Sequence, residues 1–175
     1  EIVARRGITH AHLILNEVRY LVKHSLRQVG RPDESKDGID MAICVLDEST
    51  KTLQYSGANN PLYIIKERNG TPELVEYKPD RMPLGYYMGR DLPFTKHEIQ
   101  LETGDAFYMF SDGFPDQKGG ERSKKFMIKN FKKLLLRIQH QSMYEQKNTL
   151  ERTLQEWQNG SEQIDDILVM GVRLQ

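Results

Sequence analysis

The sequence predicts an α+β fold built mainly of antiparallel sheets. Apolar runs of strand length come in pairs joined by short polar turns, which is the pattern of hairpins. The elements follow one another as a helix, four or more strands, a loop, two strands, two helices and a final strand. A parallel sheet would show strands and helices in regular alternation. A sandwich of antiparallel sheets therefore fits better.

The first elements are helical. Glu1–Arg6 followed by Gly7 reads as the last turn of a helix, because basic residues precede a glycine C-cap. A second helix is predicted from the N-cap Thr9 to about Val29, where apolar residues recur at helical spacing, and Gly-Arg-Pro at 30–32 ends it. A chain that opens on the end of a helix has either lost its beginning or starts with a frayed turn.

Two hairpins are predicted next. Met41–Leu46 is a continuous apolar run, which indicates a strand covered on both faces. Asp47–Thr50 is a polar turn, and Thr52–Ser56 reads as the returning strand. The second hairpin joins strands at 62–65 and 74–77 through the turn 68–71.

The remaining elements follow a loop over Pro79–Asp91, which contains two prolines and two glycines. Phe94–Leu101 alternates as an edge strand does, whereas 106–110 is apolar throughout and predicts a buried strand. The closing elements are helices at 124–140 and 142–158 and a strand at 167–172. The chain shows no internal repeat or linker, so one domain over residues 1–175 is expected.

Composition excludes several classes of function. The 25 Lys and Arg residues balance the 25 Asp and Glu residues, so the average charge does not favour binding to nucleic acid or to a membrane surface. A single cysteine, Cys44, excludes an internal disulfide and multi-cysteine zinc sites, and favours a reducing cytosol. It lies in an apolar run with no phosphate-binding arginine after it, so we expect it in the core. We expect a cytoplasmic location.

Acidic residues stand next to two of the predicted strands. Ser111-Asp112-Gly113 follows the apolar strand at 106–110, and Asp165-Asp166 directly precedes the final strand. Carboxylates held at strand ends suit hard divalent cations. Each pattern has a plainer interpretation: Asp-Gly is a common turn dipeptide, and an acidic pair often opens a solvated strand.

Five motifs in one order resemble the SpoIIE/RsbU-type bacterial phosphatases, which are PP2C-like serine/threonine phosphatases. They are Asp-Gly-Ile-Asp-Met-Ala at 37–42, Ser-Gly-Ala-Asn-Asn-Pro at 56–61, Met-Pro-Leu-Gly at 82–85, Gly-Asp at 104–105 leading into Ser-Asp-Gly, and the pair at 165–166. The resemblance spans about residues 37–174. It implies a PP2C-like α-β-β-α sandwich with Mg²⁺ or Mn²⁺ at the sheet ends.

Site residues are carried over from this resemblance one by one. Asp112 and Asp165 match metal-ligating aspartates, and both are taken as catalytic; Asp166 and Gly113 are further candidates for the metal site. Arg81 stands in a segment similar to one near the family's catalytic face and is a candidate for binding substrate phosphate. The plainer interpretation of Arg81, a solvated arginine in an ordered Pro-Gly connection, is favoured.

Two family motifs are missing. The strand motif Gly-Asp-x-Tyr/Phe-Asp, whose aspartate bridges two metals, and Asp-x-Thr-Gly-His-Gly do not occur. The resemblance therefore implies an N-terminally truncated domain that lacks its first strands. We expect little or no phosphatase activity from the chain alone. Exposed sheet edges should also make it self-associate.

The implied function is removal of phosphate from phosphoserine or phosphothreonine in bacterial signalling. In the family the substrates include anti-sigma-factor antagonists of partner-switching pathways, and an upstream sensor domain lies on the same polypeptide. Two metal ions would activate water directly, so no protein nucleophile is needed. The competing hypothesis is a pseudophosphatase module that only docks partners. A cluster of lysines at Lys124, Lys125, Lys129, Lys132 and Lys133 is compatible with docking an acidic partner.

Overall fold

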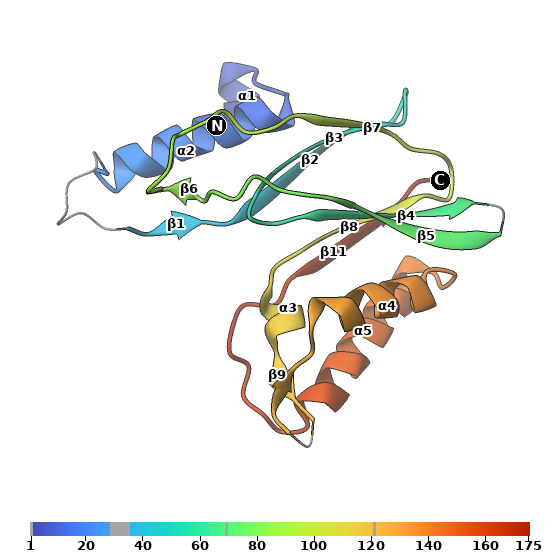
Figure 1. Ribbon diagram of the computed structural model, residues 1–175. Coiled ribbons are helices and arrows are strands. Elements are labelled where there is room, and N and C mark those ends of the chain that lie inside the picture. Colours follow the sequence, from blue (N-terminus) through green and yellow to red (C-terminus); the bar gives the residue numbers. More distant parts are fainter. Residues whose placement is uncertain (1, 29–35, 69, 121) are drawn as a thin grey trace. The chain divides into compact units, whose positions relative to one another are not determined.

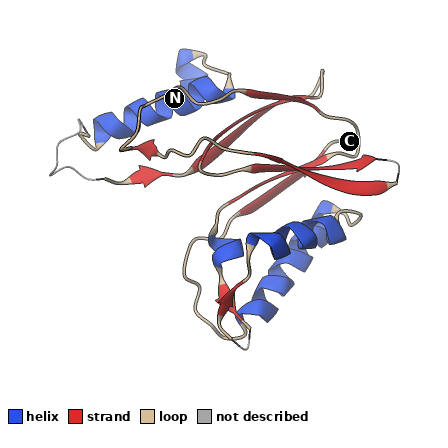
Figure 2. Ribbon diagram, viewed as in Figure 1, coloured by secondary structure: helices blue, strands red, loops and turns tan. Residues whose placement is uncertain are grey.

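The computed structural model describes residues 2–28, 36–68, 70–120 and 122–175 (Figure 1). Two compact units result, one from Glu1–Leu62 with Tyr77–Glu102 and the other from Tyr63–Glu76 with Thr103–Gln175. Each unit contains helices and an antiparallel sheet (Figure 2). The predicted helix stop at 30–32 and Asn69 of the second turn lie outside the described residues.

The first unit places a long helix against a three-stranded sheet. Its elements are α1 (Ile2–Arg6), α2 (Ala11–Ser25), β1 (Gly38–Ile39), β2 (Met41–Asp47), β3 (Thr52–Ala58), β6 (Leu84–Gly85) and β7 (His97–Gln100). The strand order is β2-β3-β7, while β1 and β6 form a separate two-stranded ribbon. Helix α2 packs against β2, β3 and β6. Leu15 of this helix joins Ala58, Met82, Leu84 and Phe94 in a buried cluster.

Several predictions for this unit are confirmed and others need correction. Gly7 ends α1 in the left-handed conformation, with φ +66°, and its N–H donates to the Val3 carbonyl at 3.1 Å. The N-cap of α2 is His10 rather than Thr9. The prediction that Met41–Leu46 is covered on both faces is wrong, because β2 stands at a sheet edge and these residues are only half-buried.

The second unit has a four-stranded sheet in the order β11-β8-β4-β5. Its strands are β4 (Leu62–Arg68), β5 (Thr71–Tyr77), β8 (Ala106–Phe110) and β11 (Val169–Arg173), and its helices are α3 (Gly113–Asp116), α4 (Ile128–Ile138) and α5 (Met143–Gln158). The short strands β9 (Lys118–Gly119) and β10 (Lys124–Lys125) form a ribbon. In Figure 1, α4 and α5 lie side by side in orange.

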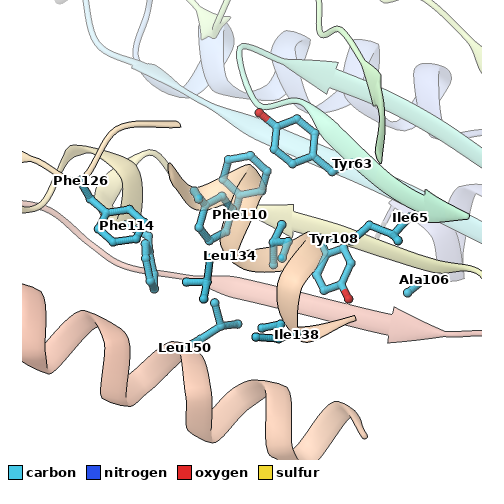
Figure 3. Packing of buried hydrophobic residues seen from close by; sticks show 12 residues of the cluster. Tyr63, Ile65, Ala106, Tyr108, Phe110, Phe114, Phe126, Leu134, Ile138 and Leu150 are labelled. Atoms are coloured by element: carbon cyan, nitrogen blue, oxygen red, sulfur yellow. The ribbon is translucent and has the colours of Figure 1, made fainter. Parts of the chain in front are cut away.

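An aromatic cluster forms the core of the second unit (Figure 3). Phe131 of α4 is fully buried, and its ring centroid lies 4.8 Å from that of Phe110 and 4.9 Å from that of Phe114. Phe110 ends β8 and Phe114 belongs to α3. The core therefore holds the strand, the short helix and the turn between them in fixed positions, and this turn carries Asp112.

The helix predicted over 124–140 begins later, at Ile128. Lys124 and Lys125 instead pair with Gly119 and Lys118 in the ribbon, and Met127 has φ +76°, so the chain turns before the helix can start. The next helix begins where it was predicted. The side chain of its N-cap, Ser142, accepts from the Glu145 N–H, and the Glu145 carboxylate accepts from the Ser142 N–H. The two bonds together form a complete capping box.

Candidate metal site at a sheet edge

The candidate site lies where β8 ends and β11 begins. These strands are antiparallel, with Phe110 opposite Val169, so the last residue of one strand and the first of the other lie at the same edge of the sheet. One residue further out, the Ser111 N–H donates to the Leu168 carbonyl at 3.0 Å. The register therefore places the two acidic motifs at neighbouring strand ends.

The Ser111 hydroxyl continues this contact beyond the ladder. It donates to the Asp166 carbonyl at 2.7 Å and accepts from the Leu168 N–H at 2.9 Å. Leu168 therefore bonds to a side chain where a strand partner would otherwise stand, which explains why β11 begins at Val169 and not at Ile167 as predicted. The same hydroxyl links the residue before Asp112 to the backbone of Asp166.

Gly113 has a different role from the one its sequence suggests. The dipeptide Asp-Gly is typical of a turn, yet Gly113 begins α3 and its φ is not positive. A Cβ built at Gly113 would lie 2.3 Å from the Asp166 carbonyl oxygen and 2.9 Å from the carbonyl carbon. Glycine is required because the Asp166 backbone passes too close for any side chain.

The three carboxylates are all exposed to solvent. Asp112 is the N-cap residue of α3, and one turn later the Asp116 N–H donates to its carbonyl at 2.9 Å. Asp165 accepts the Asp166 N–H on Oδ1 at 2.7 Å, which orders the acidic pair locally. The fold brings Asp112 and the segment 165–166 to one accessible edge, where Gly113, the first residue of α3, packs against the Asp166 backbone.

A further positioning residue, Gln117, escaped the sequence analysis. Its side chain is fully buried, and Nε2 donates to the Glu162 carbonyl at 2.9 Å. Its own carbonyl accepts the indole N–H of Trp157 at 3.0 Å. Gln117 thereby attaches the segment leading to Asp165 to the chain that follows α3. No local pattern marks a glutamine for such a role, since its partners are distant in the sequence.

Other candidate residues lie elsewhere or in ordinary roles. Arg81 belongs to the first unit and is exposed, and its contact with substrate phosphate stays a prediction. Cys44 is half-buried in β2 and not in the core as expected, and desolvation raises the pKa of its thiol to about 12, so the thiol stays neutral near pH 7. Asp116, in the helix that Asp112 caps, is paired with Lys125 at 2.6 Å.

The donor set fits a hard cation in part. Carboxylate oxygens are the ligands that Mg²⁺ and Mn²⁺ favour, and Mg²⁺ is commonly held by one or two carboxylates with water completing its shell. Across the described ranges, no group of three or more His, Cys, Asp or Glu side chains is placed to hold a metal ion. Asp112, Asp165 and Asp166 would supply part of a coordination shell.

Comparisons with known proteins define the class. The SiaA-PP2C domain of Pseudomonas aeruginosa has the same fold with a TM-score of 0.83 and 28% identity, over 99% of this chain and 64% of that chain. The Mn-presoaked phosphatase domain of SpoIIE from Bacillus subtilis matches with a TM-score of 0.54 and 15% identity, over 93% and 70% of the two chains. The RsbU and RsbW domains of Rv1364c from Mycobacterium tuberculosis match with a TM-score of 0.62 and 17% identity, over 98% of this chain and 44% of that chain.

These likenesses confirm the predicted fold class, that of PP2C-like phosphatase domains. The family model for stage II sporulation protein E (SpoIIE) matches residues 3–175, so the chain belongs to the SpoIIE family of PP2C-type phosphatases. It spans 64% of the SiaA chain that it resembles. No curated protein matches the sequence. No helix among the described residues is long and apolar enough to cross a bilayer.

Replacing Ser111 by alanine tests the connection that its hydroxyl makes. The variant loses both hydroxyl bonds, and because the site is partly exposed, water replaces some of them, so we expect the free energy of unfolding to fall by about 1 kcal/mol. Urea unfolding measures the change. Ser161→Ala, at an exposed position in the same unit, is the control and should stay within about 0.5 kcal/mol of the parent. Equal stabilities of the two variants would show that the hydroxyl connects nothing.

Proposed function

We propose that this chain is the C-terminal part of a metal-dependent phosphoserine/phosphothreonine protein phosphatase. One observation carries the proposal: the register of β8 and β11 and the Ser111 hydroxyl bring Asp112 and the Asp165–Asp166 segment to the same exposed sheet edge. Membership of the SpoIIE family and the likeness to the SiaA-PP2C domain support it.

Each residue of this edge has a distinct part in the proposed chemistry. Asp112 and Asp165 would hold Mg²⁺ or Mn²⁺ through carboxylate oxygens, with Asp166 and the Gly113 backbone as further contributors. Metal ions bound at such a site lower the pKa of water and neutralise charge on phosphoryl oxygens. Ser111 and Gln117 would orient the two carboxylate-bearing segments through their hydrogen bonds to the chain at 162–168. Arg81 is a candidate for the substrate phosphate.

The proposed setting is bacterial signalling. The phosphatase domain of Bacillus subtilis SpoIIE belongs to a cell fate determinant, and the resemblance to SpoIIE/RsbU-type phosphatases implies a role in partner switching or sigma-factor regulation. The substrate would then be a phosphoprotein such as an anti-sigma-factor antagonist. The domain would serve a cytoplasmic sensor protein as its output, with the sensor upstream on the same polypeptide.

A hydrolysis assay tests the proposed activity. We expect the 175-residue chain to turn over p-nitrophenyl phosphate at close to the background rate with Mn²⁺, because two or three carboxylates bind the ion weakly. A longer polypeptide that supplies Gly-Asp-x-Tyr-Asp and Asp-x-Thr-Gly-His-Gly should be active. Robust turnover by the chain alone would contradict the first expectation. An inactive longer polypeptide would favour the alternative, a partner-binding pseudophosphatase.

Self-association is a further expectation for the isolated chain. Strands β2 and β11 each stand at a sheet edge, and Leu168 and Met170 beside or within β11 are 60% and 49% exposed. An open edge with apolar neighbours pairs readily with a second copy. Light scattering over a concentration series should show a mass above that of the monomer. A constant monomer mass at the highest concentration would contradict this expectation.

A further inference from the structure

A groove between α4 and α5 concentrates positive charge around an apolar floor. Its volume is about 450 Å³, and it is lined by Phe126, Asn130, Lys133, Leu134, Arg137 and Thr153. Phe126 and Leu134 are 7% and 3% exposed and form the apolar part. All of these residues belong to the second unit, so the groove is a feature of one compact body.

Three cations of α4, Lys129, Lys133 and Arg137, form what we call the basic stripe. Their spacing of four residues places them on one face of the helix, and all three are exposed. Within the part of the chain that the structure describes, no carboxylate pairs with them. Two neighbouring cations do have partners: Lys125 contacts Asp116 at 2.6 Å and Lys132 contacts Glu76 at 2.9 Å.

Apart from Arg137, whose place in the last turn suits the helix dipole, the basic stripe destabilises the helix that carries it. Like charges four residues apart repel each other, and Lys129 stands in the first turn, where the helix dipole disfavours a cation. That turn contains no acidic residue, and the N-cap Met127 provides no side-chain hydrogen bond. Helix α5 begins instead with a complete capping box. A charged face that is merely solvated would not need this arrangement, and local rules are commonly broken where a surface has a function.

We propose that the basic stripe and its groove bind an acidic segment of a partner protein. The stripe extends over about 12 Å with a cation roughly every 6 Å, at 1.5 Å of rise per residue. Carboxylates on every second residue of an extended segment, or on every fourth residue of a helix, match this spacing. The apolar floor then accommodates one apolar side chain of the same segment.

The chemistry of the groove favours a protein over a nucleic acid. Proteins that follow a phosphate backbone use a larger excess of cations and aromatic rings on which bases stack. The chain has equal numbers of acidic and basic residues, and the one aromatic ring lining the groove, Phe126, is buried. This proposal is independent of the phosphatase activity.

Fluorescence anisotropy with the 175-residue chain tests the proposal. The probe is a fluorescein-labelled peptide in which glutamate alternates with serine around one central leucine. We expect the triple variant K129E/K133E/R137E to bind it about tenfold more weakly than the parent, and about 0.5 M salt to weaken the parent similarly. The control variant K78E/R90E/K118E makes the same charge change at exposed positions outside the groove and should bind as the parent does.

A single substitution separates binding from folding. K129E removes one repulsion and places an acid in the first turn of α4, so its thermal midpoint should rise while its affinity for the peptide falls about threefold. Equal affinities of the two triple variants would overturn the proposal, as would a midpoint for K129E that falls together with the affinity. Tighter binding of a labelled oligothymidylate than of the peptide would also overturn it, in favour of a nucleic-acid surface.

Discussion

Gly113→Ala is expected to lower the free energy of unfolding by about 2–3 kcal/mol, a typical cost of overpacking. The added methyl group would lie 2.3 Å from the Asp166 carbonyl oxygen, and backbone on both sides resists displacement. The sign of this change in unfolding free energy distinguishes a clash with the Asp166 backbone from the ordinary effect of alanine in a helix. Gly113 begins a helix at ordinary φ, where alanine would otherwise stabilise by up to about 1 kcal/mol.

Urea unfolding of Gly113→Ala and Gly89→Ala provides a matched comparison. The three atoms nearest to a Cβ at Gly89 all belong to the side chain of Tyr87, which is 38% exposed, so a side chain and not backbone would have to move; Gly89 also has no positive φ. The control should change the free energy of unfolding by less than about 0.5 kcal/mol. If Gly113→Ala were neutral or stabilising, the segment 165–166 would not lie against α3.

Asp112→Asn is expected to have the largest effect on activity. In a longer polypeptide that is an active phosphatase, we expect kcat/KM to fall about 10²–10³-fold, because the amide is a weaker ligand and carries no charge. Asp116→Asn is the control, four residues along the same segment. Its carboxylate pairs with Lys125 at 2.6 Å, so activity should stay within about twofold of the parent. Equal losses in both variants would indicate a structural effect of this segment and no specific role of Asp112.

Local sequence patterns predict the type of each element better than they predict what surrounds it. Both hairpins, the buried strand ending at Phe110 and the helix capped by Ser142 are read from local patterns, and the structure contains all of them. The half-burial of β2 follows from its place at a sheet edge, which no local pattern contains. The four-residue helix α3 was also missed, because its residues Gly-Phe-Pro-Asp have turn propensities and the core around Phe114 holds them helical.

The candidate site also combines residues that local patterns mark with residues that they do not. Its carboxylates were identified from their place beside predicted strands and from the family motifs. The residues that bring them together were not, since the Ser111 and Gln117 side chains act on carbonyls more than forty residues away. The reason for glycine at 113 was also misread, because close approach of a distant backbone leaves the same sequence signature as a turn.

Paramagnetic NMR with Mn²⁺ on the 175-residue chain tests the central claim most directly. Substoichiometric Mn²⁺ should broaden the amide signals of residues 111–114 and 165–168 together, because one ion would lie close to both segments. In Asp112→Asn and in Asp165→Asn both sets should recover, whereas Asp116→Asn should behave as the parent. Broadening of one segment without the other, or equal broadening in the Asp112→Asn variant, would contradict a shared metal site at this sheet edge.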